Sequence, residues 1–178
     1  MAPPAAVLDE LAGIEHGLRP RCTRTHRSRT SRTASAPRCP PRLRRRRSTS
    51  CRPRPGAAKA IGHVLPNLDG KLSGDSIRVP VPVGSIVELN TTVSRDVTRE
   101  DVLAAYRTAA EGIPCGRPGA PRGRRSVSSD ITGNPASSIF DSALTRVDGR
   151  HAKVVAWYDN EWGFSNRVID TLELLAAG

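Results

Sequence analysis

Residues 151–175, HAKVVAWYDNEWGFSNRVIDTLELL, contain the segment that decides the fold. Residues 154–158 form an apolar run rich in β-branched and aromatic side chains, which predicts a buried strand. An amphipathic helix is predicted over residues 161–176, because aliphatic side chains recur there at helical spacing. Those side chains are Val168, Leu172 and Leu175. Four of the chain's six aromatic residues fall between residues 157 and 164, so we expect much of the core to form around this unit.

The 178-residue chain has a formal net charge of +11, and one window carries it. Residues 19–55 contain fourteen arginines and no lysine or acid, a charge of +14, so the remaining residues sum to −3. The window has no apolar periodicity, which predicts an irregular basic segment that binds phosphate backbones non-specifically. A non-enzymatic protein that binds nucleic acid through residues 19–55 is therefore one alternative. No aromatic residue lies among these arginines, so base stacking is not expected.

The four cysteines fit no zinc pattern and include no CxxC pair. They are Cys22, Cys39, Cys51 and Cys115. No apolar run approaches the length of a membrane span, and no secretory signal is recognisable. We therefore expect a cytoplasmic protein with reduced thiols, no metal site and no membrane association.

Apolar spacing predicts three further helices, over residues 2–17, 57–65 and 98–111. Gly17 stands where a C-terminal cap of the first helix would lie. The third helix begins with Thr98, and Asp101 follows three residues later, which predicts a variant of the capping box.

Extended structure is predicted between the second and third of these helices. Apolar side chains at alternate positions of residues 87–93 predict a half-buried strand. Arg78 lies between two aliphatic residues in an earlier extended segment, and Pro80 and Pro82 suit a sheet edge or a bend. Residues 113–125, rich in arginine, proline and glycine, predict a second irregular segment.

Three stretches of the sequence resemble one protein family. They are APPAAVLDELAGIEHGL (residues 2–18), GAAKAIGHVLPNLDGKLSGDSIRVPVP (56–82) and WYDNEWGFSNRV (157–168). All three are similar to the C-terminal catalytic domain of glyceraldehyde-3-phosphate dehydrogenase. The resemblance implies an α+β fold, with a mostly antiparallel sheet and helices on one side, here incomplete. It divides the chain into a catalytic-domain remnant, residues 1–18 and 56–178, and an Arg-rich insert, residues 19–55, with no dinucleotide-binding domain.

The Arg-rich insert has a further interpretation, which is translation out of frame. Codons chosen for residues 19–27 read, two bases later, as Thr-Thr-Val-His-Ala-Tyr-Thr-Gln. This peptide is similar to the family's sequence after EHGL and includes its catalytic histidine. A shifted reading of residues 113–125 also gives a family-like peptide with acidic and hydrophobic residues.

We therefore predict that resequencing the gene will show compensated insertions or deletions around codons 19–55 and 113–125. Each window should encode a family-like peptide in an alternative frame. If neither window yields such a peptide in any frame, the frame hypothesis is wrong and a genuine basic segment is favoured.

The resemblance also indicates candidate binding residues. Arg78 is similar to an arginine that holds a substrate or inorganic phosphate, although a strand arginine that faces solvent or a carboxylate is the ordinary alternative. Gly56 matches the glycine of a Ser-Thr-Gly phosphate loop, but Arg54 and Pro55 replace the serine and threonine. Asn160 is similar to an asparagine near the nicotinamide carboxamide, and a helix cap is its commoner role.

The family's reaction implies NAD as cofactor, glyceraldehyde 3-phosphate as substrate, and a homotetramer. It uses a cysteine thiolate and a histidine base. We expect this chain to lack the nucleophilic cysteine, the histidine and the NAD-binding domain, so no catalytic residue is assigned. Activity and NAD binding by this chain alone are not expected.

Overall fold

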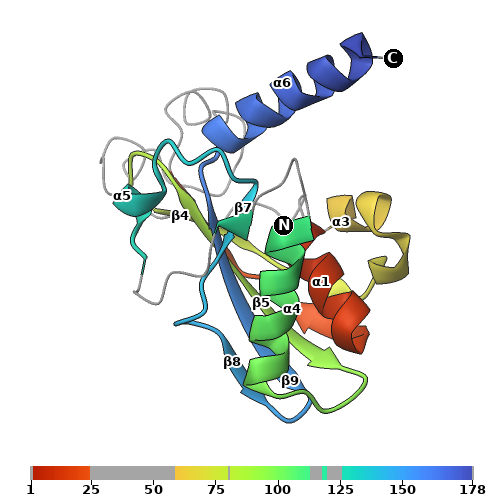
Figure 1. The fold of residues 1–178 in the computed structure, drawn as a ribbon. Helices are drawn as coiled ribbons and strands as arrows, with labels where there is room; N and C mark the ends of the chain where they lie inside the picture. Colours follow the sequence, from red (N-terminus) through yellow and green to blue (C-terminus); the bar gives the residue numbers. More distant parts are fainter. Residues whose placement is uncertain (1, 25–58, 80, 113–117, 120–125, 178) are drawn as a thin grey trace, which may run out of the picture.

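Two long antiparallel strands, β5 (Ser85–Val93) and β9 (His151–Tyr158), form the centre of one sheet in the computed structural model (Figure 1). Their register runs from Ser85 opposite Tyr158 to Thr92 opposite His151. The structure describes residues 2–24, 59–79, 81–112, 118–119 and 126–177.

Burial in these two strands follows the sequence pattern. In β5, buried and half-buried positions alternate along the whole strand, which confirms the half-buried strand predicted over residues 87–93. The buried strand predicted over residues 154–158 is confirmed too, and it begins three residues earlier, at His151. Its most buried side chains are Val154, Val155 and Ala156.

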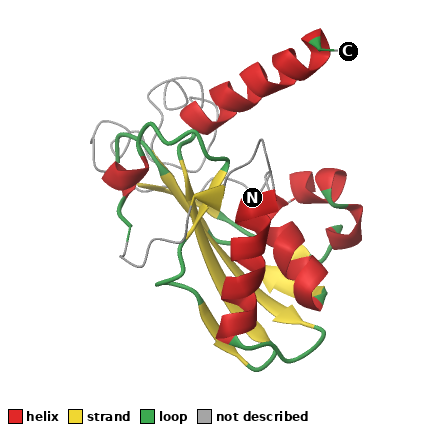
Figure 2. Cartoon of the chain, viewed as in Figure 1, coloured by secondary structure: helices red, strands yellow, loops and turns green. Residues whose placement is uncertain are grey.

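Shorter strands extend the sheet on both sides of this pair (Figure 2). They are β1 (Ile14–Leu18), β2 (Arg21–Arg24), β3 (Leu72–Ser73), β4 (Ser76–Val79), β6 (Pro118–Gly119), β7 (Ser138–Phe140) and β8 (Arg146–Asp148). β1 and β2 pair antiparallel with β5, and β7 and β8 pair antiparallel with β9. Parallel pairs join β1 to β3, β2 to β4 and β6 to β7. The sheet is therefore mainly antiparallel, as predicted.

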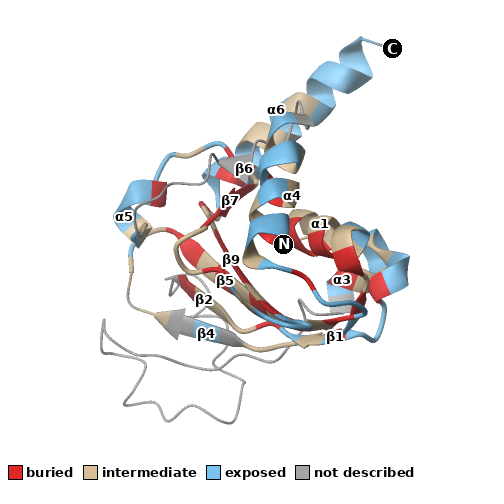
Figure 3. Ribbon diagram, turned by 60° about the horizontal axis from the view of Figure 1, so that its bottom comes forward, coloured by how far each residue is buried: buried red, intermediate tan, exposed pale blue. Residues whose placement is uncertain are grey.

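The helical segments are α1 (Ala2–Ala12), α3 (Lys59–Val64), the 3-10 turn η3 (Pro66–Leu68), α4 (Arg99–Gly112), α5 (Ser128–Ile131) and α6 (Trp162–Ala176). Those near the N-terminus and in the middle of the chain, α1, α3 and α4, cover one face of this sheet (Figure 3). α1 and α4 pack against each other over β5, and the main hydrophobic core lies between them and the sheet. This arrangement confirms the predicted α+β fold with helices on one side.

An aromatic pair links α4 to the sheet. The ring of Tyr106 stacks on the ring of Phe140, with centroids 4.3 Å apart and planes 5° from parallel. Both side chains are buried, and the Tyr106 hydroxyl donates a hydrogen bond to the Pro4 carbonyl at 2.5 Å. This contact ties α1, α4 and β7 together.

The start of α4 has the predicted capping box. The Thr98 N–H donates to Asp101 Oδ2 at 3.0 Å, and the Asp101 N–H donates to Thr98 Oγ1 at 3.1 Å. These two bonds satisfy N–H groups that the first helical turn leaves without an intrahelical acceptor.

The helix predicted over residues 2–17 is wrong at its C-terminal end. α1 ends at Ala12, and the strand β1 follows. The Asp9 carbonyl accepts a hydrogen bond from the Gly13 N–H at 2.8 Å, and Gly13 has φ +64°, which favours glycine. Gly13 rather than Gly17 therefore terminates the helix, and the residues beyond it gain more hydrogen bonds by pairing with β5.

The irregular segment predicted over residues 19–55 differs from the structure at its start. Arg21–Arg24 form β2, whose main chain pairs with β4 on one side and β5 on the other. Pairing on both sides stabilises a strand whose own residues have no apolar pattern. Residues 25–55 lie outside the described residues. In the second window, residues 113–125, we expected no strand. Pro118–Gly119 nevertheless form β6, because they pair in parallel with β7.

Helix α6 forms close to its predicted bounds, but its apolar stripe does not join the core. The helix projects away from the sheet (Figure 1). Exposed fractions are 42% for Val168, 60% for Leu172 and 74% for Leu175. The expectation that much of the core forms around residues 151–175 therefore holds for the strand β9, which supplies buried side chains, and is wrong for the helix.

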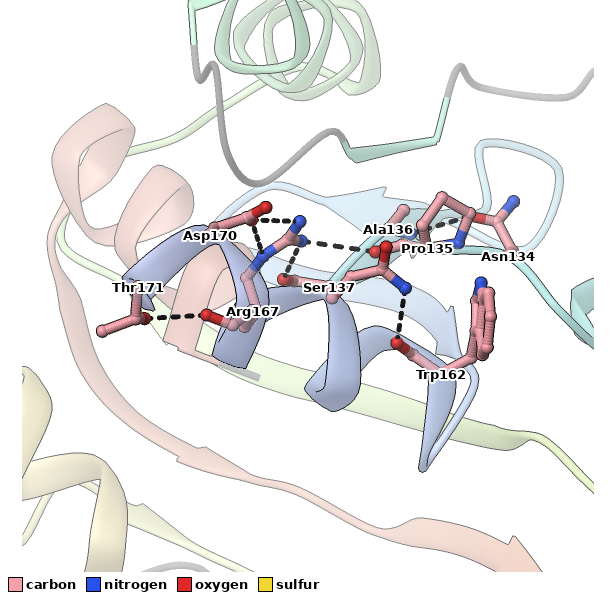
Figure 4. Close-up of polar contacts among 9 residues, drawn as sticks. Asn134, Pro135, Ala136, Ser137, Trp162, Arg167, Asp170 and Thr171 are labelled. Atoms are coloured by element: carbon pink, nitrogen blue, oxygen red, sulfur yellow. Dashed lines mark hydrogen bonds and ion pairs between the residues drawn. The ribbon is translucent and has the colours of Figure 1, made fainter. Parts of the chain in front are cut away.

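The first turns of α6 fasten the helix to the loop before β7 (Figure 4). Gly163 is buried, and a Cβ at this position would lie 3.2 Å from the Ala136 carbonyl oxygen. Arg167 donates from Nη1 to Ser137 Oγ at 3.0 Å and from Nε to Asp170 Oδ2 at 2.6 Å. The helix is thus anchored through its N-terminal half.

Candidate functional site

Three polar side chains meet where β2, β5 and the turn after β9 come together. Ser85 Oγ lies 2.7 Å from Thr23 Oγ1 and 2.9 Å from Asn160 Oδ1. The Asn160 amide donates to Thr23 Oγ1 at 3.1 Å. Thr23, Ser85 and Asn160 therefore form one hydrogen-bonded group, which we call the Asn160 cluster.

Strand register brings this cluster together. Thr23 lies opposite Ser85 in the β2–β5 pair, and Ser85 lies opposite Tyr158 in the β5–β9 pair. Residues directly opposite each other point to the same face of an antiparallel sheet. Thr23 is 1% exposed and Ser85 is 2% exposed, so their hydroxyls depend on protein partners.

Asn160 does not cap the helix that follows it. The N-cap position belongs to Glu161, which makes no side-chain cap bond. The buried Asp159, two residues earlier, accepts hydrogen bonds at Oδ1 from the N–H groups of Glu161 and Trp162, both at 3.0 Å. Its Oδ2 accepts another from the Gly133 N–H at 3.0 Å. A carboxylate at a helix N-terminus is favourable for the helix dipole. Asp159 thus fixes the turn and directs the Asn160 amide to Thr23 and Ser85.

Arg78 lies at the same end of the sheet. Its position in β4 is in register with Thr23 of β2, and Thr23 in turn bonds to Asn160. β4 pairs with β2 alone among the described strands, as Pro80 and Pro82 lead us to expect for an edge strand. The structure therefore brings two predicted site positions, Arg78 and Asn160, to one region. The third, Gly56, lies outside the described residues.

Two arginines lie beside the cluster. Arg21 is opposite Val87 in β5, on the same face as Thr23, and its Nη1 donates to the Tyr158 hydroxyl at 3.3 Å. Arg19 is 3% exposed. Burial and the nearby charge of Arg21 lower the pKa of Arg19 below its usual value, and Tyr158 acts weakly in the opposite direction. This end of the sheet thus carries one buried and one half-buried positive charge.

Cys22 lies between these residues but on the other face of the sheet. It pairs with Ile86 and Ile77, one position out of phase with Thr23. Burial, and then the charge of Glu88, raises the pKa of the Cys22 thiol. The side chain therefore neither faces the Asn160 cluster nor favours the reactive thiolate.

Several members of this region were missed from the sequence. Thr23, Arg19 and Arg21 fall in residues 19–55, for which we predicted irregular structure, so no strand register was predicted for them. Ser85 carries no motif of its own. The Asp159-Asn160 pair did carry a signal, because aspartate and asparagine often bond to backbone N–H groups just before a helix, but the sequence suggested this role for Asn160 rather than Asp159.

Other kinds of site are not supported in the described part of the chain. Its histidine, cysteine and acidic side chains form no group of three or more that could hold a metal ion. None of its helices is long and apolar enough to cross a membrane. A hollow on the uncovered face of the sheet, lined by residues such as His16, Asn90 and Lys153, does not include the Asn160 cluster.

Comparison with known proteins gives a consistent result. The family model for the glyceraldehyde 3-phosphate dehydrogenase C-terminal domain matches residues 1–160. The chain is 66% identical to a glyceraldehyde-3-phosphate dehydrogenase of Kitasatospora aureofaciens over 99% of its own length and 53% of that protein. It is 46% identical to glyceraldehyde-3-phosphate dehydrogenase 1 of Streptomyces avermitilis over 93% of its length and 49% of that protein.

A third relative, the glyceraldehyde-3-phosphate dehydrogenase of Mycobacterium avium, is 52% identical over 67% of this chain and 35% of its own length. The chain thus spans about half the length of the curated relatives it matches, or less. The family match runs through every strand that the structure describes and ends at Asn160, so it includes the whole Asn160 cluster. On this evidence the chain belongs to the glyceraldehyde-3-phosphate dehydrogenase family and corresponds to its C-terminal domain.

Proposed function

We propose that this chain supplies the catalytic-domain part of an NAD-dependent glyceraldehyde-3-phosphate dehydrogenase that works in glycolysis. The family reaction oxidises the aldehyde through a cysteine thioester, which phosphate then releases. One observation supports the proposal above all. Thr23 accepts a hydrogen bond from Asn160, and it lies opposite Arg78 in the β2–β4 strand pair. By resemblance to the family, Asn160 would bind the cofactor and Arg78 would bind the substrate phosphate.

Asn160 has the hydrogen-bonding capacity that a nicotinamide carboxamide needs. An asparagine amide has two N–H donors and an oxygen with two lone pairs. The bonds to Thr23 and Ser85 use one donor and one lone pair, so one of each is left. NAD, when bound, would accept the hydride, and Asn160 would orient its carboxamide.

Arg78 would hold the phosphate of glyceraldehyde 3-phosphate, because a planar guanidinium presents two donors to an oxyanion. Gly56 would contribute a backbone N–H to a phosphate loop. Pro55, which has no N–H, weakens that loop. We extend the proposal to a cytoplasmic homotetramer, as in the family, and to a lack of activity in the 178-residue chain by itself.

A chimera tests the assigned roles. It joins the preceding half of the Kitasatospora aureofaciens protein to this chain and replaces residues 19–55 and 113–125 with those of that protein. We expect NAD reduction with glyceraldehyde 3-phosphate and phosphate. Arg78→Met should raise the KM for the aldehyde by about 10-fold or more, since hydrogen bonds to charged groups contribute about 1.5–3 kcal/mol. Asn160→Ala should raise the KM for NAD.

Arg107→Met serves as the control, since Arg107 is exposed on α4. Its kinetic constants should match those of the parent chimera. An inactive chimera would contradict the proposed function. An active chimera in which the Arg78 and Asn160 variants behave like the parent would contradict the two roles.

A further inference from the structure

Arg19 is buried and Arg21 is half-buried beside the Asn160 cluster, and each has a buried Nε atom without an acceptor. Arg19 is 3% exposed, and its Nε has no hydrogen-bond acceptor. The Nε of Arg21 is also buried and has none. Three ion pairs of the described residues use other cations, namely Arg150, Lys153 and Arg167. A buried guanidinium without a counter-charge is strongly unfavourable.

No part of the Arg-rich window can supply that counter-charge. The sequence contains no aspartate or glutamate from His16 to Leu68, and none from residue 113 to residue 125. Every acidic side chain therefore lies in the described part of the chain. The acceptor of the Arg21 guanidinium is the Tyr158 hydroxyl, and the groups that shift the pKa of Arg19 include no carboxylate. A bound anion can supply the negative charge.

We propose that Arg19 and Arg21 form a binding site for a small phosphate-type oxyanion. Both guanidinium groups can donate from the Nε atoms that have no protein acceptor, and a tetrahedral oxyanion has enough acceptors for both. The Tyr158 hydroxyl accepts a bond from Arg21, and its own proton can be donated to the same anion. This site uses neither Arg78 nor Gly56, so it stands independently of the proposed function.

The position of the pair favours a small anion over a nucleic acid. Arg21 shares the helix-covered face of the sheet with Thr23 and Val87, and Arg19 is almost completely covered. A phosphate on a duplex is fixed in a wide, stiff backbone and cannot enter such a position. Burial, and then repulsion from Arg21, lowers the pKa of Arg19, and an anion bound to both groups would reduce that repulsion.

Phosphate binding to the full 178-residue chain provides the test. Isothermal titration with inorganic phosphate, at an ionic strength held constant with sodium chloride, measures the affinity. Arg19→Met together with Arg21→Met should weaken it by about tenfold or more, because each charged hydrogen bond to the anion is lost. Arg45→Met together with Arg46→Met removes the same charge from the Arg-rich window and should change the affinity less than twofold.

The melting temperature of each protein in chloride shows whether a variant is folded, so a loss of phosphate binding can be told apart from a folding defect. Phosphate should raise the melting temperature of the parent chain above its value in chloride, since a ligand of the folded state stabilises it. It should not raise that of the Arg19→Met, Arg21→Met variant, which should melt in chloride no lower than the parent because buried, uncompensated charges are gone. If phosphate leaves the parent's melting unchanged, or affects both double variants equally, the proposal is wrong.

A 20-base-pair DNA duplex distinguishes the two sources of phosphate. We expect the Arg19→Met, Arg21→Met variant to bind the duplex as the parent does, at the same salt concentration. A loss of duplex binding as large as the loss of phosphate affinity would overturn the small-anion site, because it would show that a polymer reaches these arginines.

Discussion

The purified 178-residue chain is expected to give no NAD reduction with glyceraldehyde 3-phosphate and phosphate, a rate at least about 10⁶-fold below that of an intact relative. A covalent nucleophile and its base act as a unit, so no partial rate should survive without them. Cys22 cannot substitute, because it points to the face opposite the Asn160 cluster and its thiol has a raised pKa. The assay is NADH absorbance over hours.

Two variants of the chain test this prediction further. Cys22→Ser should match the parent chain, since the thiol is not placed to react with a substrate near Asn160. Restoring a family-like frame in residues 19–55 alone should also give no activity, whereas the intact Kitasatospora aureofaciens enzyme should be active in the same buffer. Turnover by the purified chain, with contaminating enzyme excluded by mass spectrometry, would contradict the prediction.

Sequence patterns within a segment were sufficient to predict its secondary structure where the segment's own residues determine that structure. The alternation of residues 87–93 predicted β5, because one face of that strand packs on helices and the other does not. Thr98 and Asp101 predicted the start of α4, because the capping box is made within four residues. The family resemblance predicted Arg78 and Asn160 as site residues. Their positions lie at one end of the sheet, and their binding roles stay predictions.

Features that depend on distant pairing were not predictable in this way. β2 is a strand because β4 and β5 lie on either side of it, and nothing in its arginine-rich sequence indicates those neighbours. The apolar pattern of α6 correctly predicted a helix with an apolar stripe. The same pattern cannot specify what lies against that stripe, and the described structure leaves it exposed.

The Phe140→Ala variant is expected to lose about 4 kcal/mol of unfolding free energy. Phe140 is 4% exposed in the core, and large-to-small changes of buried aromatic residues cost about 3–5 kcal/mol. The stack on Tyr106 adds to this, since aromatic pairs contribute about 0.5–1.5 kcal/mol beyond the area they bury. The measurement is the urea midpoint and slope of the purified chain, followed by circular dichroism.

Phe164→Ala is the matched control, because it makes the same chemical change at a residue of α6 that is 70% exposed. Substitutions at exposed positions usually change stability by less than about 0.5 kcal/mol, so its urea midpoint should stay near that of the parent. The comparison separates core packing from the loss of an aromatic ring as such. Equal destabilisation by the two variants would mean that α6 packs against the rest of the chain in solution, and that the exposed stripe is covered there.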